Sequence, residues 1–249
     1  MARGTAHKVL IASGKGGVGK SSCAVFLGHA LAQHGFRVLI VALDAGLRGL
    51  DLMLGVESKS AYDMGDVLKG VCDPYDAVTP SDIQRNLSLL SAPSGDWDEF
   101  QQADLVWLCN QIASYYDWIL LDAPAGIGNG FRLGLDAAER ALLVVNPDPV
   151  CVREAAVASR LLEREKGSRF PQRLIINRVR KAPVGETLPD LDAVIDQVAV
   201  QLIGVVPEEP SIPKAAANGL PLPQTSKAFL PFDNIAWRME GVYRPLAFQ

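Results

Sequence analysis

A glycine-rich segment near the start of the chain carries the residue types needed to bind phosphate. Residues 14–22 read GKGGVGKSS and follow the apolar run KVLIA at 8–12 almost at once. Residues 14–21 fit the pattern G-x-x-x-x-G-K-[ST], in which glycines let backbone N–H groups curl around phosphate oxygens. The strand-like run before it and the helix-like stretch after it favour this interpretation over a chance glycine-rich turn. The predicted phosphate-binding residues are Gly14, Gly16, Gly17, Val18, Gly19, Lys20, Ser21 and Ser22.

Two lysines in this segment predict different chemistry. Lys20 stands where the pattern places a cation on the β- and γ-phosphates, and Ser21 stands where a hydroxyl binds Mg²⁺. Lys15 occupies a variable position, where a long cation points away from its own nucleotide. It could neutralise a phosphate held by a second copy of the protein if two subunits close face to face. An ordinary solvated lysine is the alternative.

Short apolar runs indicate the elements that must position these residues. The runs are nearly continuous, as expected for strands buried on both faces of a parallel sheet, and helix-like stretches separate most of them. We therefore expect a single α/β domain over residues 1–249, with a doubly wound, mostly parallel sheet and helices on both faces. The predicted strands are 8–12, 37–43, 87–91, 118–122, 141–146, 173–177 and 202–206. The predicted helices are 20–34, 100–115, 151–165 and 189–201, with a loop and a short helix at 207–223.

Polar and glycine residues follow each predicted strand. In open parallel sheets, ligands bind beyond the carboxyl ends of the strands, so these segments are expected to meet at one edge. This convergence predicts a nucleotide site there. The segments are DAGLRGLD (44–51), DAPAGIG (122–128), NPDPVCVRE (146–154), NR (177–178) and PEEP (207–210).

Composition argues against several classes of protein. The net charge of -4 argues against a non-specific nucleic-acid binder, which needs a basic face. The four cysteines form no C-x-x-C pair, which argues against a zinc site or a disulfide framework. We find neither a signal peptide nor an apolar stretch of membrane-spanning length, and expect a cytoplasmic protein.

Five segments, in order from about residue 8 to about residue 248, resemble the ParA/MinD superfamily and within it the MinD family of cell-division ATPases. KGGVGKS resembles its deviant Walker A loop, in which the early lysine is the signature of an ATP-sandwich dimer. The second and third segments resemble the two switch segments of MinD. The remaining matches are LDAGLRGLDLMLGVES with AYDMGDVLKG, DAPAGIGNG, VVNPDPVCVREA and LIGVVPEEPSIPKAAANGLPL.

The resemblance implies a P-loop ATPase with ATP or ADP and Mg²⁺ as ligands. Asp44 would orient or deprotonate the attacking water and would join Ser21 and Asp122 at the metal. A turn or helix-cap aspartate is the alternative for such residues. Gly126 would bring the second switch to the γ-phosphate. The remaining implied contacts, on the adenine side, are Asn177, Arg178, Pro207 and Glu208.

The resemblance also implies a function. Mg²⁺ and ATP would close a homodimer, hydrolysis would open it, and the switch would place the division septum. A division-inhibitor or topological-regulator protein would bind near Arg153 and Glu154. Ala42 replaces the first aspartate of the D-x-D that MinD often carries, and Ser22 replaces a common threonine.

Alternatives of other classes stay open at this point. One alternative is an adaptor that binds ATP, hydrolyses it slowly and positions flagella or another polar structure. Ala42 favours it, because the first aspartate of the D-x-D is missing. A DNA-binding partition ATPase is disfavoured by the acidic balance, and an iron–sulfur carrier by the cysteine spacing.

The C-terminal segment departs most from the family, which ends in an amphipathic, basic membrane helix. This chain reaches RPLAFQ where that helix would begin. The stretch 232–246 contains Trp237, Met239, Val242 and Tyr243 but few basic residues, so we expect a helix docked on the core, with membrane anchoring as the alternative. Membrane binding would then come through a partner or a tail outside this sequence, or would not occur. Peripheral association with the inner face of the cell membrane is the resulting alternative to a purely cytoplasmic location.

Overall fold

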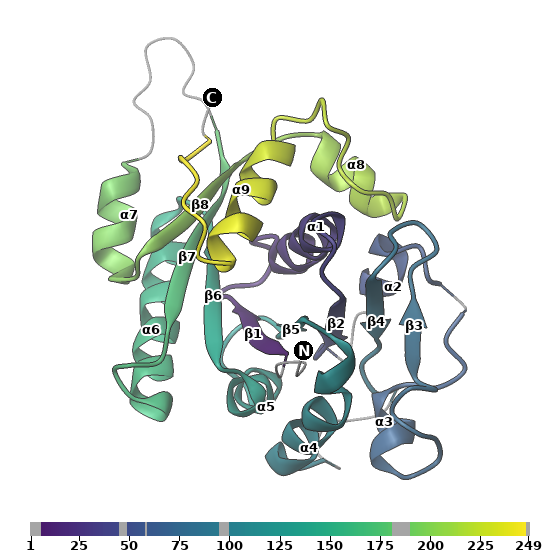
Figure 1. Cartoon of the computed structure of the whole chain (residues 1–249). Coiled ribbons are helices and arrows are strands. Elements are labelled where there is room, and N and C mark those ends of the chain that lie inside the picture. The colour runs from purple at the N-terminus through teal and green to yellow at the C-terminus, as the bar shows by residue number, and fades with distance from the viewer. Residues whose placement is uncertain (1–5, 45–48, 58, 95–99, 181–189, 248–249) are drawn as a thin grey trace.

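Eight strands form a single sheet in the computed structural model, which describes residues 6–44, 49–57, 59–94, 100–180 and 190–247 (Figure 1). The order across the sheet is β3-β4-β2-β5-β1-β6-β7-β8, and the pairing is parallel except between β3 and β4. The strands are β1 (His7–Ala12), β2 (Val38–Ala42), β3 (Val78–Pro80), β4 (Leu87–Leu90), β5 (Trp118–Asp122), β6 (Arg140–Val145), β7 (Gln172–Val179) and β8 (Leu202–Pro207). The predicted doubly wound, mostly parallel sheet is confirmed.

Helices cover both faces because the chain crosses the sheet in two directions. From β1 the chain passes to β2 on one side, whereas from β5 it passes over β1 to β6, β7 and β8 on the other. Right-handed crossovers therefore place the two sets of helices on opposite faces. One set is α1 (Lys20–Gln33), α2 (Gly49–Met53), α8 (Ser211–Ala217) and α9 (Phe229–Met239). The other is α4 (Gln102–Ile112), α5 (Asn129–Ala137), α6 (Pro149–Lys166) and α7 (Leu191–Val198).

The sequence patterns missed the shortest elements. β3 has three residues, of which only Thr79 is buried, so no apolar run marks it. The five-residue helices α2 and α3 (Met64–Leu68) are too short to show a helical period. The central strands were predicted because every residue of β2 and β5 is buried.

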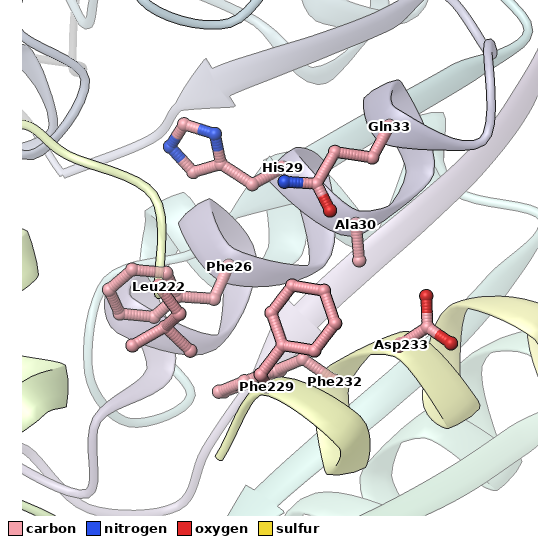
Figure 2. A pocket seen from close by; sticks show the side chains of 8 residues that line it. All are labelled: Phe26, His29, Ala30, Gln33, Leu222, Phe229, Phe232 and Asp233. Carbon is pink, nitrogen blue, oxygen red and sulfur yellow. The ribbon is translucent and has the colours of Figure 1, made fainter. Parts of the chain in front are cut away.

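The predicted helix at 232–246 is correct in its docking but wrong in its length. Phe232 and Ile235 of α9 are buried against α1 and β8, and Figure 2 shows Phe232 beside Phe26 of α1, with ring centroids 5.6 Å apart. The helix ends at Met239, because Gly241 adopts a left-handed conformation with φ 78°. Tyr243 lies beyond the helix and is exposed.

None of the helices among the described residues is long and apolar enough to cross a bilayer. The assignment of residues 1–249 to a single domain stays a prediction.

Candidate nucleotide-binding site

The loop between β1 and α1 has the backbone of a phosphate cradle. Gly17 and Gly19 both adopt left-handed conformations, with φ of 77° and 90°, which residues with a Cβ rarely enter. Gly14 is required for a different reason, since a Cβ there would lie 2.3 Å from the backbone carbonyl carbon of Glu154 in α6. The loop then runs directly into α1 at Lys20, so the helix N-terminus faces any bound anion.

The predicted cation, hydroxyl and carboxylate meet at the carboxyl end of β5. Ser21 Oγ donates to Asp122 Oδ2 at 2.6 Å, and Lys20 Nζ lies 3.4 Å from Asp122 Oδ1. Asp122 is 2% exposed. Burial raises the pKa of the Asp122 carboxyl, and the charge of Lys20 and the hydrogen bond from Ser21 oppose that effect. The buried carboxylate thus holds the two side chains that the loop pattern assigns to phosphate and metal.

Asp44 follows β2, the strand next to β5, on the same edge of the sheet. Its charge contributes to the raised pKa of Asp122, so the two carboxylates interact. Ala42 pairs in register with Asp122 and is buried. An aspartate at residue 42 would place another carboxylate beside a buried one, and alanine removes that repulsion. Residues 45–48 of the predicted first switch lie outside the described part of the chain.

A cavity of about 660 Å³ adjoins the loop on the side predicted to hold adenine. The predicted residues Gly19, Ser22, Asn177, Arg178 and Glu208 all line it. Pro207 ends β8 directly before this wall. Sequence reasoning missed four further lining residues, although the segment PEEPSIP contains all of them: Glu209, Pro210, Ile212 and Pro213.

Two residues of the adenine side, Asn177 and Glu208, already have protein contacts, and a third, Arg178, has an unusual backbone conformation. Asn177 Nδ2 donates to the Val18 carbonyl oxygen at 2.7 Å, so this side chain braces the phosphate loop. Arg178 has a left-handed backbone, with φ 54°. Glu208 pairs with Arg180, and that hydrogen bond holds the pKa of the Glu208 carboxyl below its usual range. Contact of these residues with adenine stays a prediction.

Comparison with known proteins agrees with this geometry. A family model for the CobQ/CobB/MinD/ParA nucleotide binding domain matches residues 9–222. The septum site-determining protein MinD of Bacillus subtilis (strain 168) is 33% identical over 96% of this chain and 90% of its own length. The Synechocystis protein of the same name is 36% identical, over 94% of this chain and 89% of its own. The chain belongs to the MinD family. The resemblance noted in the sequence is confirmed.

Solved structures of the MinD family share the fold. A chain of the MinC:MinD cell division protein complex from Aquifex aeolicus superposes with a TM-score of 0.89 at 33% identity, over 97% of this chain and 98% of that chain. MinD from Pyrococcus horikoshii OT3, complexed with Mg-ADP, superposes with a TM-score of 0.82 at 28% identity, over 94% and 96% of the two chains. The chain therefore has the P-loop nucleotide-binding fold of MinD.

Two residues singled out from the MinD resemblance lie at the rim of the site. The Lys15 side chain is exposed. Hydrogen bonds from Cys151 lower the pKa of the Asp148 carboxyl, and the charge of Lys15 adds to this effect, which places the lysine near the start of α6. Gly126 has φ 80°, and its N–H donates to the Ser13 carbonyl oxygen at 3.2 Å. That N–H would have to leave Ser13 to reach a γ-phosphate.

The oxygen atoms of the site suit a magnesium ion that is bound partly by protein side chains and partly by the phosphates of a nucleotide. Within the described residues, no three His, Cys, Asp or Glu side chains gather as metal ligands. Ser21, Asp44 and Asp122 supply hydroxyl and carboxylate oxygens instead. Mg²⁺ prefers oxygen ligands and keeps several waters and substrate phosphates, so it needs few protein groups. The residues present therefore fit Mg²⁺ with ATP or ADP.

Proposed function

We propose that this MinD-family chain is an ATPase switch that contributes to placement of the division septum. The observation that carries the proposal is the joint contact of Lys20 and Ser21 with buried Asp122, beside a loop shaped for phosphate. Fold alone would not suffice, since P-loop-like folds host many functions. The MinD relatives, named for determining the septum site, support the cellular role.

The residues divide the work of hydrolysis. Lys20 would leave Asp122 to neutralise the β- and γ-phosphates, while Asp44 would orient or deprotonate the attacking water. Ser21 and Asp122 would hold Mg²⁺, Asp122 through a bound water. When bound, the metal neutralises charge on the phosphate oxygens. Catalysis of this kind is mostly positioning, so the preformed loop matters more than any single acid or base.

Lys20→Ala tests the phosphate-loop assignment. Removing the ammonium should lower ATP turnover by at least about a hundredfold, because the variant cannot offset the phosphate charge. Turnover is measured as phosphate release with Mg²⁺, and with EDTA as a metal-free arm. Lys166→Ala, at the far end of α6, is the control and should hydrolyse like the wild type. Wild-type turnover in Lys20→Ala would contradict the assignment.

The rim of the site supports a homodimer in the ATP state. Lys15 is an exposed residue of the phosphate loop. Among the described residues Asp122 is contacted by Lys20 and Ser21 and not by Lys15, so the Lys15 ammonium is available to a second copy. A second copy facing this edge would bring its Lys15 to the first copy's phosphates. Hydrolysis would remove the γ-phosphate and weaken the closed form.

An exposed groove on α6 is the proposed binding surface for a division-inhibitor partner. A cavity of about 480 Å³ is lined by Pro149, Val150, Arg153, Glu154 and Val157 of α6 and by Gln197 of α7. Val150 and Val157 are 51% and 41% exposed and line the same groove, so a partner could bury both side chains together. The Aquifex MinC:MinD complex supports a partner of this kind.

Val157→Asp should weaken partner binding about tenfold or more, because a carboxylate would be desolvated in the groove. Binding to the MinC-type protein is measured by calorimetry in Mg²⁺ and ATP. Val242→Asp, at an equally exposed valine beyond α9, is the matched control. Equal affinities for both variants would place the partner elsewhere.

A further inference from the structure

Two asparagine amides converge on one carbonyl oxygen of the phosphate loop. Asn177, near the end of β7, is 4% exposed and donates from Nδ2 to the Val18 oxygen at 2.7 Å. Asn146 is the first residue after β6. With its amide nitrogen turned toward the loop, Asn146 donates to the same Val18 oxygen at 3.1 Å and to the Asn177 carbonyl oxygen at 3.3 Å. A carbonyl oxygen has two lone pairs, so Val18 can accept both bonds.

These bonds fix the direction of a peptide group. The Val18 carbonyl and the Gly19 N–H belong to one planar trans peptide and point in opposite directions. Holding the carbonyl oxygen toward the two asparagines directs the Gly19 N–H away from them. Gly19 is left-handed, and a Cβ on it would lie 2.4 Å from Asn177 Nδ2, so the asparagine packs directly against this turn. If the peptide flipped, a carbonyl oxygen would face the phosphates in place of an N–H.

Asn146 has a distinct place in this arrangement. Its second bond, to the Asn177 backbone, ties the end of β6 to β7 beneath the loop. Asn177 also faces the cavity predicted to hold adenine, so ligand contact could draw its side chain away from Val18. Asn146 does not line that cavity but a neighbouring one of about 400 Å³, which shares Arg178 and Glu208 with it. Its bond to Val18 does not depend on where the base sits.

We propose that Asn146 is a positioning residue for the phosphate loop, holding the Val18–Gly19 peptide with its N–H presented to the nucleotide. The proposal rests on the proposed nucleotide binding, and it adds a role for Asn146, which lies in a segment predicted to reach the site but was not predicted to contact the ligand. Asn146 acts through the loop and need not touch the ligand.

Asn146→Asp separates this role from simple space filling. The side chains have nearly the same shape, but the carboxylate cannot donate and would face two carbonyl oxygens. We expect affinity for a fluorescent ATP analogue with Mg²⁺ to fall about tenfold or more, and further than in Asn146→Ala. A space-filling role predicts the reverse order, with Asn146→Ala worse than Asn146→Asp. Asn110→Asp is the control, since the Asn110 side chain accepts a hydrogen bond from Lys8 and donates none to the other described residues.

Hydrogen exchange of the nucleotide-free protein tests the same role without a ligand. Loss of the Asn146 bonds should speed exchange of the peptide that covers residues 14–22 in Asn146→Asp, but not in Asn110→Asp. Unchanged exchange together with unchanged affinity would overturn the role of Asn146. If the wild type itself does not bind the nucleotide, the proposed function fails, and the exchange result alone decides whether Asn146 holds the loop.

Discussion

At the scale of single residues, the site is organised around one buried carboxylate. Asp122 contacts the Lys20 ammonium and the Ser21 hydroxyl, and a nucleotide with Mg²⁺ would bind both of these groups. The contacts keep a 2% exposed aspartate compensated before the ligand arrives. Binding would therefore exchange one set of charge contacts for another, and an empty site does not leave a buried charge unpaired.

Lys15 is the residue whose role depends most on a second copy of the chain. Lys15→Ala should leave ATP affinity nearly unchanged, because the exposed ammonium is not needed on its own nucleotide. The same change should abolish ATP-dependent dimerisation, measured by light scattering after gel filtration. Lys166→Ala should dimerise like the wild type. If Lys15→Ala still dimerises normally with ATP, Lys15 has no role in the dimer and is an ordinary solvated surface lysine.

At the scale of elements, close packing fixes how α9 lies on β8. Gly204 in β8 is buried, and a Cβ there would lie 2.3 Å from Ile235 Cγ1 of α9. Ile235 is 1% exposed, so it has little room to move. The glycine therefore allows the last helix to seat against the sheet, which is the docking that the apolar face of the 232–246 stretch predicted.

Gly204→Ala should lower the free energy of unfolding by about 1–3 kcal/mol, because the added methyl overpacks this contact. Alanine's smaller entropy loss in a strand offsets only part of that cost. The measurement is urea unfolding followed by circular dichroism. Gly49→Ala is the control, since a Cβ at Gly49 meets nothing within 4 Å. Equal midpoints for the two variants would show that α9 can shift without cost.

Sequence reasoning found the elements with strong local signals and missed those defined by distant contacts. The loop glycines, Lys20 and Ser21 form one contiguous pattern, so the phosphate loop could be predicted from sequence. Asp122 could be predicted because it ends an apolar strand. α5 was not, because GNGFRLGLD carries glycines that oppose a helix by local propensity. One of them, Gly134, is needed because Leu10 and Leu43 approach within 2.6 Å of where its Cβ would be. Asn146 was missed as a loop contact because Val18 is far from it in sequence.

At the scale of the whole molecule, a buried histidine of α1 is expected to make the free energy of unfolding depend on pH. His29 is 3% exposed, and neither ring nitrogen has a hydrogen-bond partner within the described part of the chain. Figure 2 shows it with Gln33 and Asp233 around a cavity otherwise lined by apolar side chains. Burial lowers the pKa of His29 from 6.5 to about 4, although the neighbouring Gln84 side chain opposes the shift.

The sign of the effect follows from proton uptake. Between pH 6.5 and about 4 the unfolded chain binds a proton at His29 and the folded chain does not. Acidification through this window should therefore reduce the free energy of unfolding, by about 3 kcal/mol at its lower end. The penalty is absent above pH 6.5. His29→Leu should flatten this part of the pH profile in urea unfolding, whereas His7→Leu, at an exposed histidine, should not. Parallel profiles for wild type and His29→Leu would contradict the assignment.

The central claim concerns the whole molecule as a nucleotide-driven switch, and sedimentation velocity tests it most directly. The chain is run with Mg²⁺ and a non-hydrolysable ATP analogue, and separately with Mg²⁺ and ADP. The account predicts a species of 26.8 kDa in ADP and one of about twice that mass with the analogue. The same monomer in both conditions, at nucleotide concentrations shown to saturate binding, would contradict it.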